Sequence, residues 1–358
     1  MTLLYITNGI NGSGGLERVL SIKASLLAEE YGYNVHVLVL NNAHTNPFYE
    51  FSSTLKFHSI EVGGTPINYF NSYKNGIQKI VDQIQPDMIS VCDDGLKGFF
   101  LPRFIKTPAK WIYERHASVL LNTDNGFKGK LQRQFMNWNI RQFDQFVVLT
   151  PSNIKEWKGN NIIAIPNPIS FESLNTSSLE NKKIIVVGSH SYNKGYDLLL
   201  KVWRNIEQIY MDWELNIYGK IDKNETFVRM RDEMNLQNVK FHEPVKNIKD
   251  NYLESSIMLL TSRSEGFGMV LIEAMECGLP CVSFDCPSGP ADIIKNDEDG
   301  FLINLEDVNA MTDKISLLIE NKELRKSMGA KAKENVKRYS QHEIVKQWDE
   351  LFKTLKAQ

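Results

Sequence analysis

The stretch that most constrains the fold is TSRSEGFGMVLIEAMECGLP, Thr261 to Pro280. The apolar run Ile257 to Leu260 precedes it and predicts a buried strand of a parallel sheet. A glycine turn and a helical pattern from about Met269 follow, and Gly278 to Pro280 predict the end of that helix. A strand, a glycine turn and a helix N-terminus place free backbone amides and the positive end of a helix dipole at one point. This arrangement favours an anion, and phosphate is the usual one.

Two carboxylates flank this predicted phosphate site. Glu265 lies in the loop before the helix, and Glu273 lies about a turn and a half into it, ~7 Å along the helix axis. Gly266 and Gly268 allow a ligand to approach the backbone without a side chain in the way. The two carboxylates can accept hydrogen bonds from hydroxyl groups. A molecule with hydroxyl groups on both sides of a diphosphate is a nucleotide sugar, which is the ligand that the pattern indicates.

The same stretch resembles the E-x7-E signature of retaining glycosyltransferases of family 4. Glu265 and Glu273 stand at the two glutamate positions, and the similarity continues into FDCPSGPADII, Phe284 to Ile294. The resemblance implies that Glu265 contacts the donor sugar and that Glu273 contacts the ribose. It also implies further donor contacts from the turn and the start of the helix, at Gly266, Phe267, Gly268, Met269 and Val270. The alternative is a tight turn in some other α/β protein, with both glutamates solvated.

The strand and helix pattern predicts two domains. Apolar strands alternate with helical segments, which is typical of an α/β protein with doubly wound parallel sheets, and 358 residues suffice for two such cores. A polar linker, Ser170 to Asn181, separates the two patterns. The resemblance implies the GT-B fold, in which two Rossmann-like domains face a central cleft. We expect an acceptor-binding domain over residues 1–169, joined by a returning helix within 341–358, and a nucleotide-sugar donor domain over residues 170–340.

Lys194 is the predicted cation of the phosphate site. It follows the strand Ile184 to Val187 and opens a helix, at the carboxyl edge where open α/β sheets bind ligands. A lysine there can neutralise a leaving diphosphate, although it could also be an ordinary surface charge. The sequence resembles the family's GR…KG motif, and Lys194 matches the lysine, but Ser189 fills the arginine position. Ser189 is therefore a donor-binding residue that leaves part of the phosphate clamp in doubt. His190 or a side chain of the other domain is the candidate replacement.

A glycine-rich loop, Gly9 to Gly15, follows the first predicted strand, Leu3 to Thr7. Its end, GGLERV, resembles the GGxER loop that opens the acceptor domain of family 4, and this implies acceptor or phosphate contacts at Gly14 and Gly15. The alternative is a flexible turn. A dinucleotide-binding GxGxxG would need a third glycine two residues beyond Gly15, which argues against an oxidoreductase.

His116 is the third catalytic candidate, with Lys194 and Glu265. A short predicted strand, Ala109 to Tyr113, ends in Glu114-Arg115-His116. The resemblance implies that His116 faces the donor sugar, although the family usually lacks Arg115. The alternative is a histidine that is only a loop residue.

Charge and cysteine content narrow the classes of function. A net charge of -2 argues against a dedicated nucleic-acid binder. The sequence has no CxxC pair, so we expect buried free thiols rather than disulfides or a metal site at its four cysteines, Cys92, Cys277, Cys281 and Cys286. Met1 opens onto a strand-like run without a visible signal peptide, and no apolar run approaches ~20 residues. These features indicate a cytoplasmic protein.

Two stretches, Lys97 to Trp111 and Lys128 to Phe143, mix basic and aromatic residues. A basic amphipathic surface can dock on anionic lipid. Alternatively the aromatic rings fill the core and the charges are solvated. We favour the second interpretation for Lys128 to Phe143. The first stretch leaves open a peripheral contact with the inner face of the cell membrane.

The resemblance implies a reaction as well as a fold. We expect transfer of a hexose or N-acetylhexosamine from a nucleotide sugar, most simply UDP-linked, to a glycan or lipid-linked acceptor in cell-surface polysaccharide biosynthesis. Anomeric configuration is retained, and the leaving phosphate is the expected base. No cofactor and no catalytic metal are expected, since Lys194 and the helix amides would neutralise the diphosphate. The alternatives are a GT-B nucleotide-sugar 2-epimerase, a catalytically weak sugar-nucleotide binding protein and a Rossmann oxidoreductase.

Overall fold

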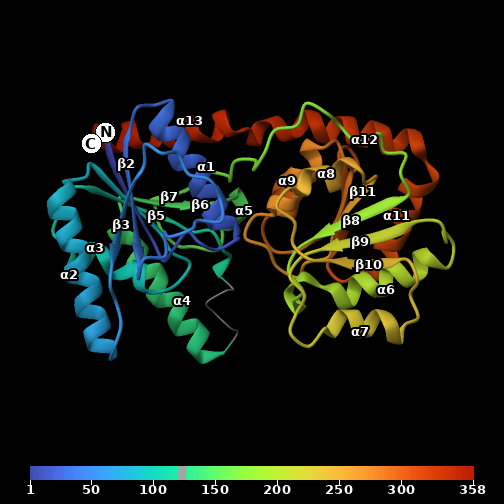
Figure 1. Ribbon diagram of the computed structural model, residues 1–358, viewed down its shortest axis with the longest axis horizontal. Helices are drawn as coiled ribbons and strands as arrows, with labels where there is room; N and C mark the ends of the chain where they lie inside the picture. The colour runs from blue at the N-terminus through green and yellow to red at the C-terminus, as the bar shows by residue number, and fades with distance from the viewer. Residues whose placement is uncertain (120–125) are drawn as a thin grey trace. The chain divides into compact units, whose positions relative to one another are not determined.

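The computed structural model describes residues 1–119 and 126–358. These residues form two compact units, one of Met1–Ser170 with Gln341–Gln358 and the other of Phe171–Ser340. Each unit contains a single sheet whose strand pairs are all parallel (Figure 1). The predicted pair of parallel α/β units is confirmed.

The first unit has a seven-stranded sheet that is doubly wound from its centre. In spatial order the strands are β3 (Lys56–Ile60), β2 (Asn34–Leu40), β1 (Thr2–Thr7), β4 (Met88–Cys92), β5 (Lys110–Glu114), β6 (Gln145–Val148) and β7 (Ile162–Ala164). Tyr5 of β1 pairs with Val37 on one side and Ser90 on the other. The chain leaves β1 in one direction and crosses to β4 in the other. Because the strands are parallel, the loops after β1, β4 and β5 lie at one edge of the sheet.

Alternate residues of each strand fill two different cores. Leu4 and Ile6 of β1 pack with helices α2 (Pro66–Ile84), η1 (Lys97–Phe100), α3 (Leu101–Phe104) and α4 (Phe127–Asn139). Leu3 and Tyr5 of the same strand pack with α1 (Gly15–Glu29) and α13 (Gln341–Lys356) on the opposite face. This period of two is what a sheet covered by helices on both faces requires. The short helix α5 (Pro151–Ile154) lies beside β7.

The last helix, α13, belongs to the first unit although the second unit precedes it in sequence. It lies against α1, as the red and blue helices of Figure 1 show. Its apolar stripe includes Ile344, Trp348 and Phe352, all buried. The Lys23 ammonium of α1 lies 3.9 Å from the centre of the Trp348 ring, so a cation–π contact joins the two helices.

The second unit has a six-stranded sheet with the order β10 (Val239–His242), β9 (Glu214–Tyr218), β8 (Lys183–Val187), β11 (Ile257–Leu260), β12 (Cys281–Asp285) and β13 (Gly300–Asn304). Its helices are α6 (Tyr196–Glu207), α7 (Thr226–Glu233), α8 (Ile248–Leu253), α9 (Met269–Glu276), α10 (Pro290–Ile293), α11 (Val308–Glu320) and α12 (Lys322–Asn335), with 3-10 turns η4 (Tyr192–Lys194) and η5 (Val336–Tyr339). Helices α6 and α11 pack together over one face, and α9 contacts β11 and β12. The loops after β8 and β11 therefore meet at the carboxyl edge of two adjacent strands.

The strand expected over Ala109 to Tyr113 is found one residue later, as Lys110–Glu114. Helix α2 begins at Pro66, because Thr65 accepts a hydrogen bond from the Asn68 amide and Pro66 fits the first helical turn. Helix α4 carries the second basic and aromatic stretch, and the core role expected for its rings is wrong for Trp138, which is 56% exposed. Phe143, by contrast, is buried. Among the described residues, every helix is too short or too polar to span a bilayer.

We expect Trp348→Ala to lower the free energy of unfolding by about 3–5 kcal/mol. The Trp348 ring of α13 is buried against Lys23 of α1, and its removal leaves a cavity. The measurement is urea unfolding followed by circular dichroism. Trp138→Ala in the same unit is the control and should change the midpoint little, since that ring is exposed. Equal effects of the two substitutions would contradict the packing role of α13.

Candidate active site

Arg263 joins the two loops at the carboxyl edge of the second unit. Its guanidinium makes two 2.8 Å contacts with the Asp197 carboxylate at the start of α6, and it donates to the Tyr192 carbonyl at 2.7 Å. The hydrogen bonds from Arg263 lower the pKa of Asp197, so the pair stays ionised. The Arg263 amide also donates to the Asn193 carbonyl at 2.7 Å. The loops after β8 and β11 are thus held together by backbone and side-chain bonds.

Lys194 and Glu265 meet where these two loops are joined. The Lys194 Nζ lies 2.7 Å from Glu265 Oε1, and both side chains are mostly buried. The Thr261 hydroxyl donates to the Lys194 carbonyl at 2.9 Å. Gly195, next in sequence, has φ +67°, and a Cβ there would lie 2.0 Å from the Thr261 carbonyl oxygen. Only glycine permits this close approach, which brings two of the three predicted catalytic residues into one site.

Helix α9 begins beside this ion pair. Gly268 has φ +105° and precedes the first helical residue, Met269, in a turn that a residue with a side chain rarely adopts. The first amides of the helix, including those of Met269 and Val270, have no acceptor within the helix. Gly266 is partly exposed, whereas Phe267 is buried against Tyr339, with ring centres 5.5 Å apart. The predicted strand, glycine turn and helix N-terminus are confirmed.

Glu273 is far more enclosed than a carboxylate beside an open site. Its side chain is 1% exposed, and Tyr252 of α8 donates its hydroxyl to Glu273 Oε2 at 3.3 Å. The carboxylate is therefore held in place before any ligand arrives. The sequence did not predict this burial, because it did not predict α8, the helix that carries Tyr252.

The replacement of the family arginine by His190 is wrong. His190 is buried, and its ring lies among aromatic rings, 4.9 Å from that of Phe241 and 5.3 Å from that of Tyr196. Burial lowers the pKa of His190 below its usual value of 6.5, so the ring is neutral at pH 7. Ser189, beside it, is exposed. Neither residue supplies a cation to the site, and a replacement from a side chain of the other domain stays a prediction.

In the first unit, Gly14 and Gly15 form the start of α1 at the carboxyl edge of the sheet. Both are exposed, and a Cβ on Gly15 would meet nothing within 4 Å. Gly14 is the N-cap of α1 and makes no side-chain cap bond. A Cβ on Gly14, by contrast, would lie 2.5 Å from a carboxylate oxygen of Glu17, so an acidic side chain already lies beside the start of this fifteen-residue helix.

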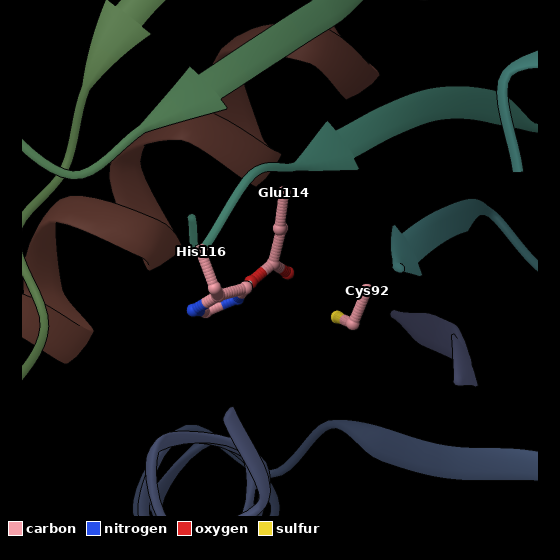
Figure 2. Close-up of side chains that lie close together, drawn as sticks. All are labelled: Cys92, Glu114 and His116. Carbon is pink, nitrogen blue, oxygen red and sulfur yellow. The ribbon is translucent and has the colours of Figure 1, made fainter. Parts of the chain in front are cut away.

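His116 lies in a buried cluster that the sequence did not predict (Figure 2). Its Nε2 is 3.3 Å from Glu114 Oε2, and its Nδ1 is buried without a hydrogen-bond partner among the described residues. Glu114 also accepts from the Ser90 hydroxyl at 2.5 Å and pairs with the ammonium of Lys23, both buried. Burial opposes ionisation of Glu114, but Lys23 and then His116 outweigh it and lower its pKa to about 2. Glu114 thus orients the His116 ring from one side.

Cys92, Glu114 and His116 offer three ligand atoms within 4.8 Å of one another, which is the spacing of a metal site (Figure 2). The Lys23 ammonium, however, contacts the same Glu114 oxygen that faces His116. Burial also raises the pKa of the Cys92 thiol, which therefore stays protonated. A cation and a neutral thiol do not suit a metal ion, and the cluster is better described as a buried ion pair that holds a histidine.

The four cysteines are free and buried, as the sequence predicts. Burial raises the pKa of Cys277 and Cys286 to about 12. Among the described residues, the closely spaced Cys277, Cys281 and Cys286 form no cluster of metal ligands.

Comparison with known proteins agrees with the two sheets and the glycine turns. Residues 172–335 match the family described as glycosyl transferases group 1, and residues 16–150 match the family described as glycosyl transferase 4-like. An uncharacterized glycosyltransferase of Haemophilus influenzae is 30% identical over 352 residues, which is 96% of this chain and 97% of that protein. The chain therefore belongs to the group 1 glycosyltransferases, and its two parallel-sheet units have the GT-B fold.

The chain is also similar to a named biosynthetic glycosyltransferase and to a glycosyltransferase-fold structure solved with a nucleotide. The amylovoran biosynthesis glycosyltransferase AmsD of Erwinia amylovora is 26% identical over 364 residues, covering 98% of this chain and 99% of that protein. The structure of HepE from Anabaena in complex with UDP and glucose has a TM-score of 0.78 at 15% identity, covering 98% of this chain and 99% of that one. The latter similarity concerns the fold alone.

We expect Lys23→Met to lower the free energy of unfolding by about 3 kcal/mol at pH 7, because it leaves the Glu114 carboxylate buried without its cation. The double variant Lys23→Met/Glu114→Gln should recover part of that loss in urea unfolding. Lys353→Met, which breaks an ion pair whose lysine is exposed, is the control and should change little.

The same pair predicts a pH dependence. Because the pKa of Glu114 is lowered from 4.5 to about 2, its contribution to stability is present above pH 4.5 and is lost as the pH falls toward 2. The stability difference between the parent and Glu114→Gln should therefore shrink between pH 6 and pH 3. A difference that stays constant over this interval would show that folding does not lower the pKa of Glu114.

Proposed function

We propose that the protein is a retaining, metal-independent glycosyltransferase that moves a hexose or N-acetylhexosamine from a UDP-sugar to a glycan or lipid-linked acceptor. The observation that carries this proposal is the Lys194–Glu265 pair beside the first turn of α9. An enzyme that uses a nucleotide sugar must hold the sugar hydroxyls and must stabilise the diphosphate as it leaves. The carboxylate suits the sugar hydroxyls, and the cation and the free amides suit the leaving diphosphate.

In this proposal each residue acts on one part of the donor. Lys194 and the amides of Gly268, Met269 and Val270 stabilise the charge that develops on the leaving diphosphate. Glu265 accepts from the sugar hydroxyls while it holds the Lys194 ammonium in place. Ser189 can donate a hydrogen bond to a phosphate oxygen but cannot neutralise it.

Four further contacts complete the proposed binding of the donor and the acceptor. Glu273 accepts from the ribose, and Gly266 and Phe267 shape the turn over the donor. His116, oriented by Glu114, contacts the transferred sugar. Gly14 and Gly15 bind the acceptor or its phosphate at the start of α1. The first unit is then the acceptor domain and the second the donor domain, both in the cytoplasm.

The proposed reaction needs no nucleophile from the protein. The bond between the anomeric carbon and the diphosphate oxygen breaks, and the acceptor oxygen bonds to the same face of that carbon. The proton of the acceptor hydroxyl passes to the leaving phosphate. Because Lys194 and the helix amides neutralise the diphosphate, no bound metal is required for this step.

The proposed donor and setting are supported by similar proteins. AmsD is named for amylovoran biosynthesis, and HepE was solved with UDP and glucose. The name of AmsD supports a biosynthetic setting for the proposed reaction, and the ligands of HepE support UDP and a hexose as the parts of the proposed donor.

The two glutamates provide the experiment that tests the function. Glu273→Ala should weaken binding of free UDP and of the UDP-sugar alike by about 2 kcal/mol, because a charge-assisted bond to ribose is lost. Glu265→Gln should lower turnover and leave binding of free UDP nearly unchanged, because its proposed partner is the sugar. Calorimetric titration of UDP and a coupled assay of UDP release, both in EDTA, measure the two effects.

Several results of this experiment would reject the proposal. Turnover that disappears in EDTA and returns with magnesium would remove the metal-free mechanism. Donor turnover without any acceptor would indicate a 2-epimerase, and UDP-sugar binding without turnover would indicate a binding protein. The same UDP affinity in Glu273→Ala and the parent would show that Glu273 does not bind ribose.

Lys194 should be unusually important, because Ser189 and His190 supply no second cation. We expect Lys194→Ala to remove at least ~3 kcal/mol of transition-state stabilisation, two decades or more in rate. Ser189→Arg should be tolerated and should tighten donor binding, since arginine offers a bidentate and permanent charge. Steady-state kinetics and UDP titration of each variant measure both effects. Lys201→Ala, an exposed lysine on α6, is the control. Near-parental activity of Lys194→Ala would place the phosphate clamp elsewhere.

A further inference from the structure

The first unit has an apolar groove that none of the proposed catalytic residues lines. It lies between α2 and the segment η1–α3, has a volume of about 240 Å³ and opens to solvent. Its wall consists of Tyr69, Phe70 and Tyr73 of α2 and of Phe100, Leu101 and Phe104 of η1–α3. We call it the α2–α3 groove. A cavity of this size with an aromatic wall can hold a segment of hydrocarbon chain.

Aromatic rings remain exposed at the mouth of the groove. Phe70 is 39% exposed and Phe104 is 37% exposed, and their rings meet edge to face with centres 5.0 Å apart. Ile67, one turn before Phe70 on α2, is 72% exposed. Apolar side chains at the rim of an apolar groove form a contiguous surface rather than isolated exposed residues, and such surfaces mark interaction sites.

Two lysines line the same groove. The Lys97 Nζ lies 3.1 Å from the Tyr69 hydroxyl and 5.4 Å from the centre of the Tyr73 ring, and Lys74 lies on the α2 wall. Within residues 1–119 and 126–358, neither lysine forms an ion pair with a carboxylate. A groove with an apolar interior and uncompensated ammonium groups fits an amphiphile with an anionic head group.

Basic residues predominate in the surrounding elements, although α2 also contains Asp82 and Lys110 pairs with Asp144. Residues 62–81, 95–113 and 126–143 contain no Asp or Glu, in a chain whose net charge is -2. Their basic residues are Lys74, Lys79, Lys97, Arg103, Lys106, Lys110, Lys128, Lys130, Arg133 and Arg141.

The elements that carry these charges are neighbours in the structure. Phe70 of α2 contacts Phe104 of α3, and the Arg103 guanidinium lies 3.7 Å from the centre of the Trp138 ring on α4. The positive charge therefore extends from the groove across α3 to α4, over a surface rather than at one point. An extended positive surface with exposed apolar rings matches an anionic membrane better than it matches a single small ligand.

We propose that the α2–α3 groove takes up a hydrocarbon chain of an anionic membrane lipid and docks the first unit on an anionic lipid surface. Lys74 and Lys97 meet the lipid phosphates, and Phe70 and Phe104 enter the acyl region beside the chain. Helix α2 begins after the carboxyl end of β3, and η1 follows the carboxyl end of β4. The groove thus belongs to the sheet edge that carries Gly14, Gly15 and His116. If the proposed function holds, docking would present that edge to an acceptor held in the membrane.

The test is cosedimentation of the full chain with vesicles of phosphatidylglycerol and phosphatidylcholine in equal parts. The parent should bind these vesicles and should not bind vesicles of phosphatidylcholine alone, and added salt should weaken binding. Phe70→Ser/Phe104→Ser should lower the partition coefficient at least tenfold, and Lys74→Gln/Lys97→Gln should also lower it at least tenfold. Ile209→Ser/Met211→Ser, which changes two exposed apolar residues of the second unit, is the matched control and should leave binding unchanged.

UDP titration without vesicles separates this proposal from the proposed function. All four proteins should bind UDP with the affinity of the parent, because none of the substitutions touches the donor residues. A parent that fails to sediment with the mixed vesicles, or a groove variant that sediments like the parent, would overturn the docking proposal. Binding of single-stranded RNA, or of a lipid-linked saccharide alone, would also overturn the docking proposal if that binding depends on these residues while the protein does not bind the vesicles.

Discussion

In a parallel sheet every strand ends at the same edge, and this constraint determines where both units can place functional residues. In the second unit, β8 and β11 are neighbours, so the loops that carry Lys194 and Glu265 begin next to each other. Arg263 then joins those loops by its bonds to Asp197 and to the Tyr192 carbonyl. Together with the bond from the Thr261 hydroxyl to the Lys194 carbonyl, that connection limits the movement of the two loops, whose ammonium and carboxylate lie 2.7 Å apart. The geometry of the site therefore depends on an arginine that takes no part in the proposed chemistry.

In the first unit, a buried ion pair holds a candidate site residue in place. Glu114 ends β5 and would carry a large desolvation cost if it were alone. Lys23 of α1 neutralises it, and Trp348 of α13 lies against the same ammonium. One buried charge pair thus connects the central sheet, the first helix and the last helix, and it leaves a carboxylate oxygen to orient His116. The distant C-terminal helix supports a residue of the candidate site because it covers the cation on which that site depends.

The sequence predicted what local patterns determine. The strand Ile257–Leu260 was expected with the bounds found, because an apolar run before a turn identifies it. Contacts between distant residues were not predictable. The pairing of Lys194 with Glu265 joins residues 71 apart, and that of Lys23 with Glu114 joins residues 91 apart. The burial of His190 depends on Phe227 and Phe241, which two other elements supply. A missing signal explains one other error: α4 has no clear apolar period, so Trp138 could not be assigned to the core or to the surface.

The charge balance of the donor site has a consequence for the proposed chemistry. Lys194 is paired with Glu265 before a donor binds, and neither Ser189 nor His190 adds positive charge. In the proposed reaction, a diphosphate entering this site meets the Lys194 ammonium, which the Glu265 carboxylate already neutralises. The first amides of α9 must then carry more of the stabilisation than they would beside a second cation, and a helix N-terminus contributes about 0.3–2 kcal/mol to a bound anion. As the bond to the sugar breaks, the charge on the leaving oxygen grows, and Lys194 is attracted more strongly to the diphosphate than to Glu265. The Glu265 carboxylate is then free to face the positive charge that develops at the anomeric carbon. In the proposed reaction, the same ion pair that weakens ground-state binding therefore favours the transition state, which is the condition for catalysis rather than tight binding.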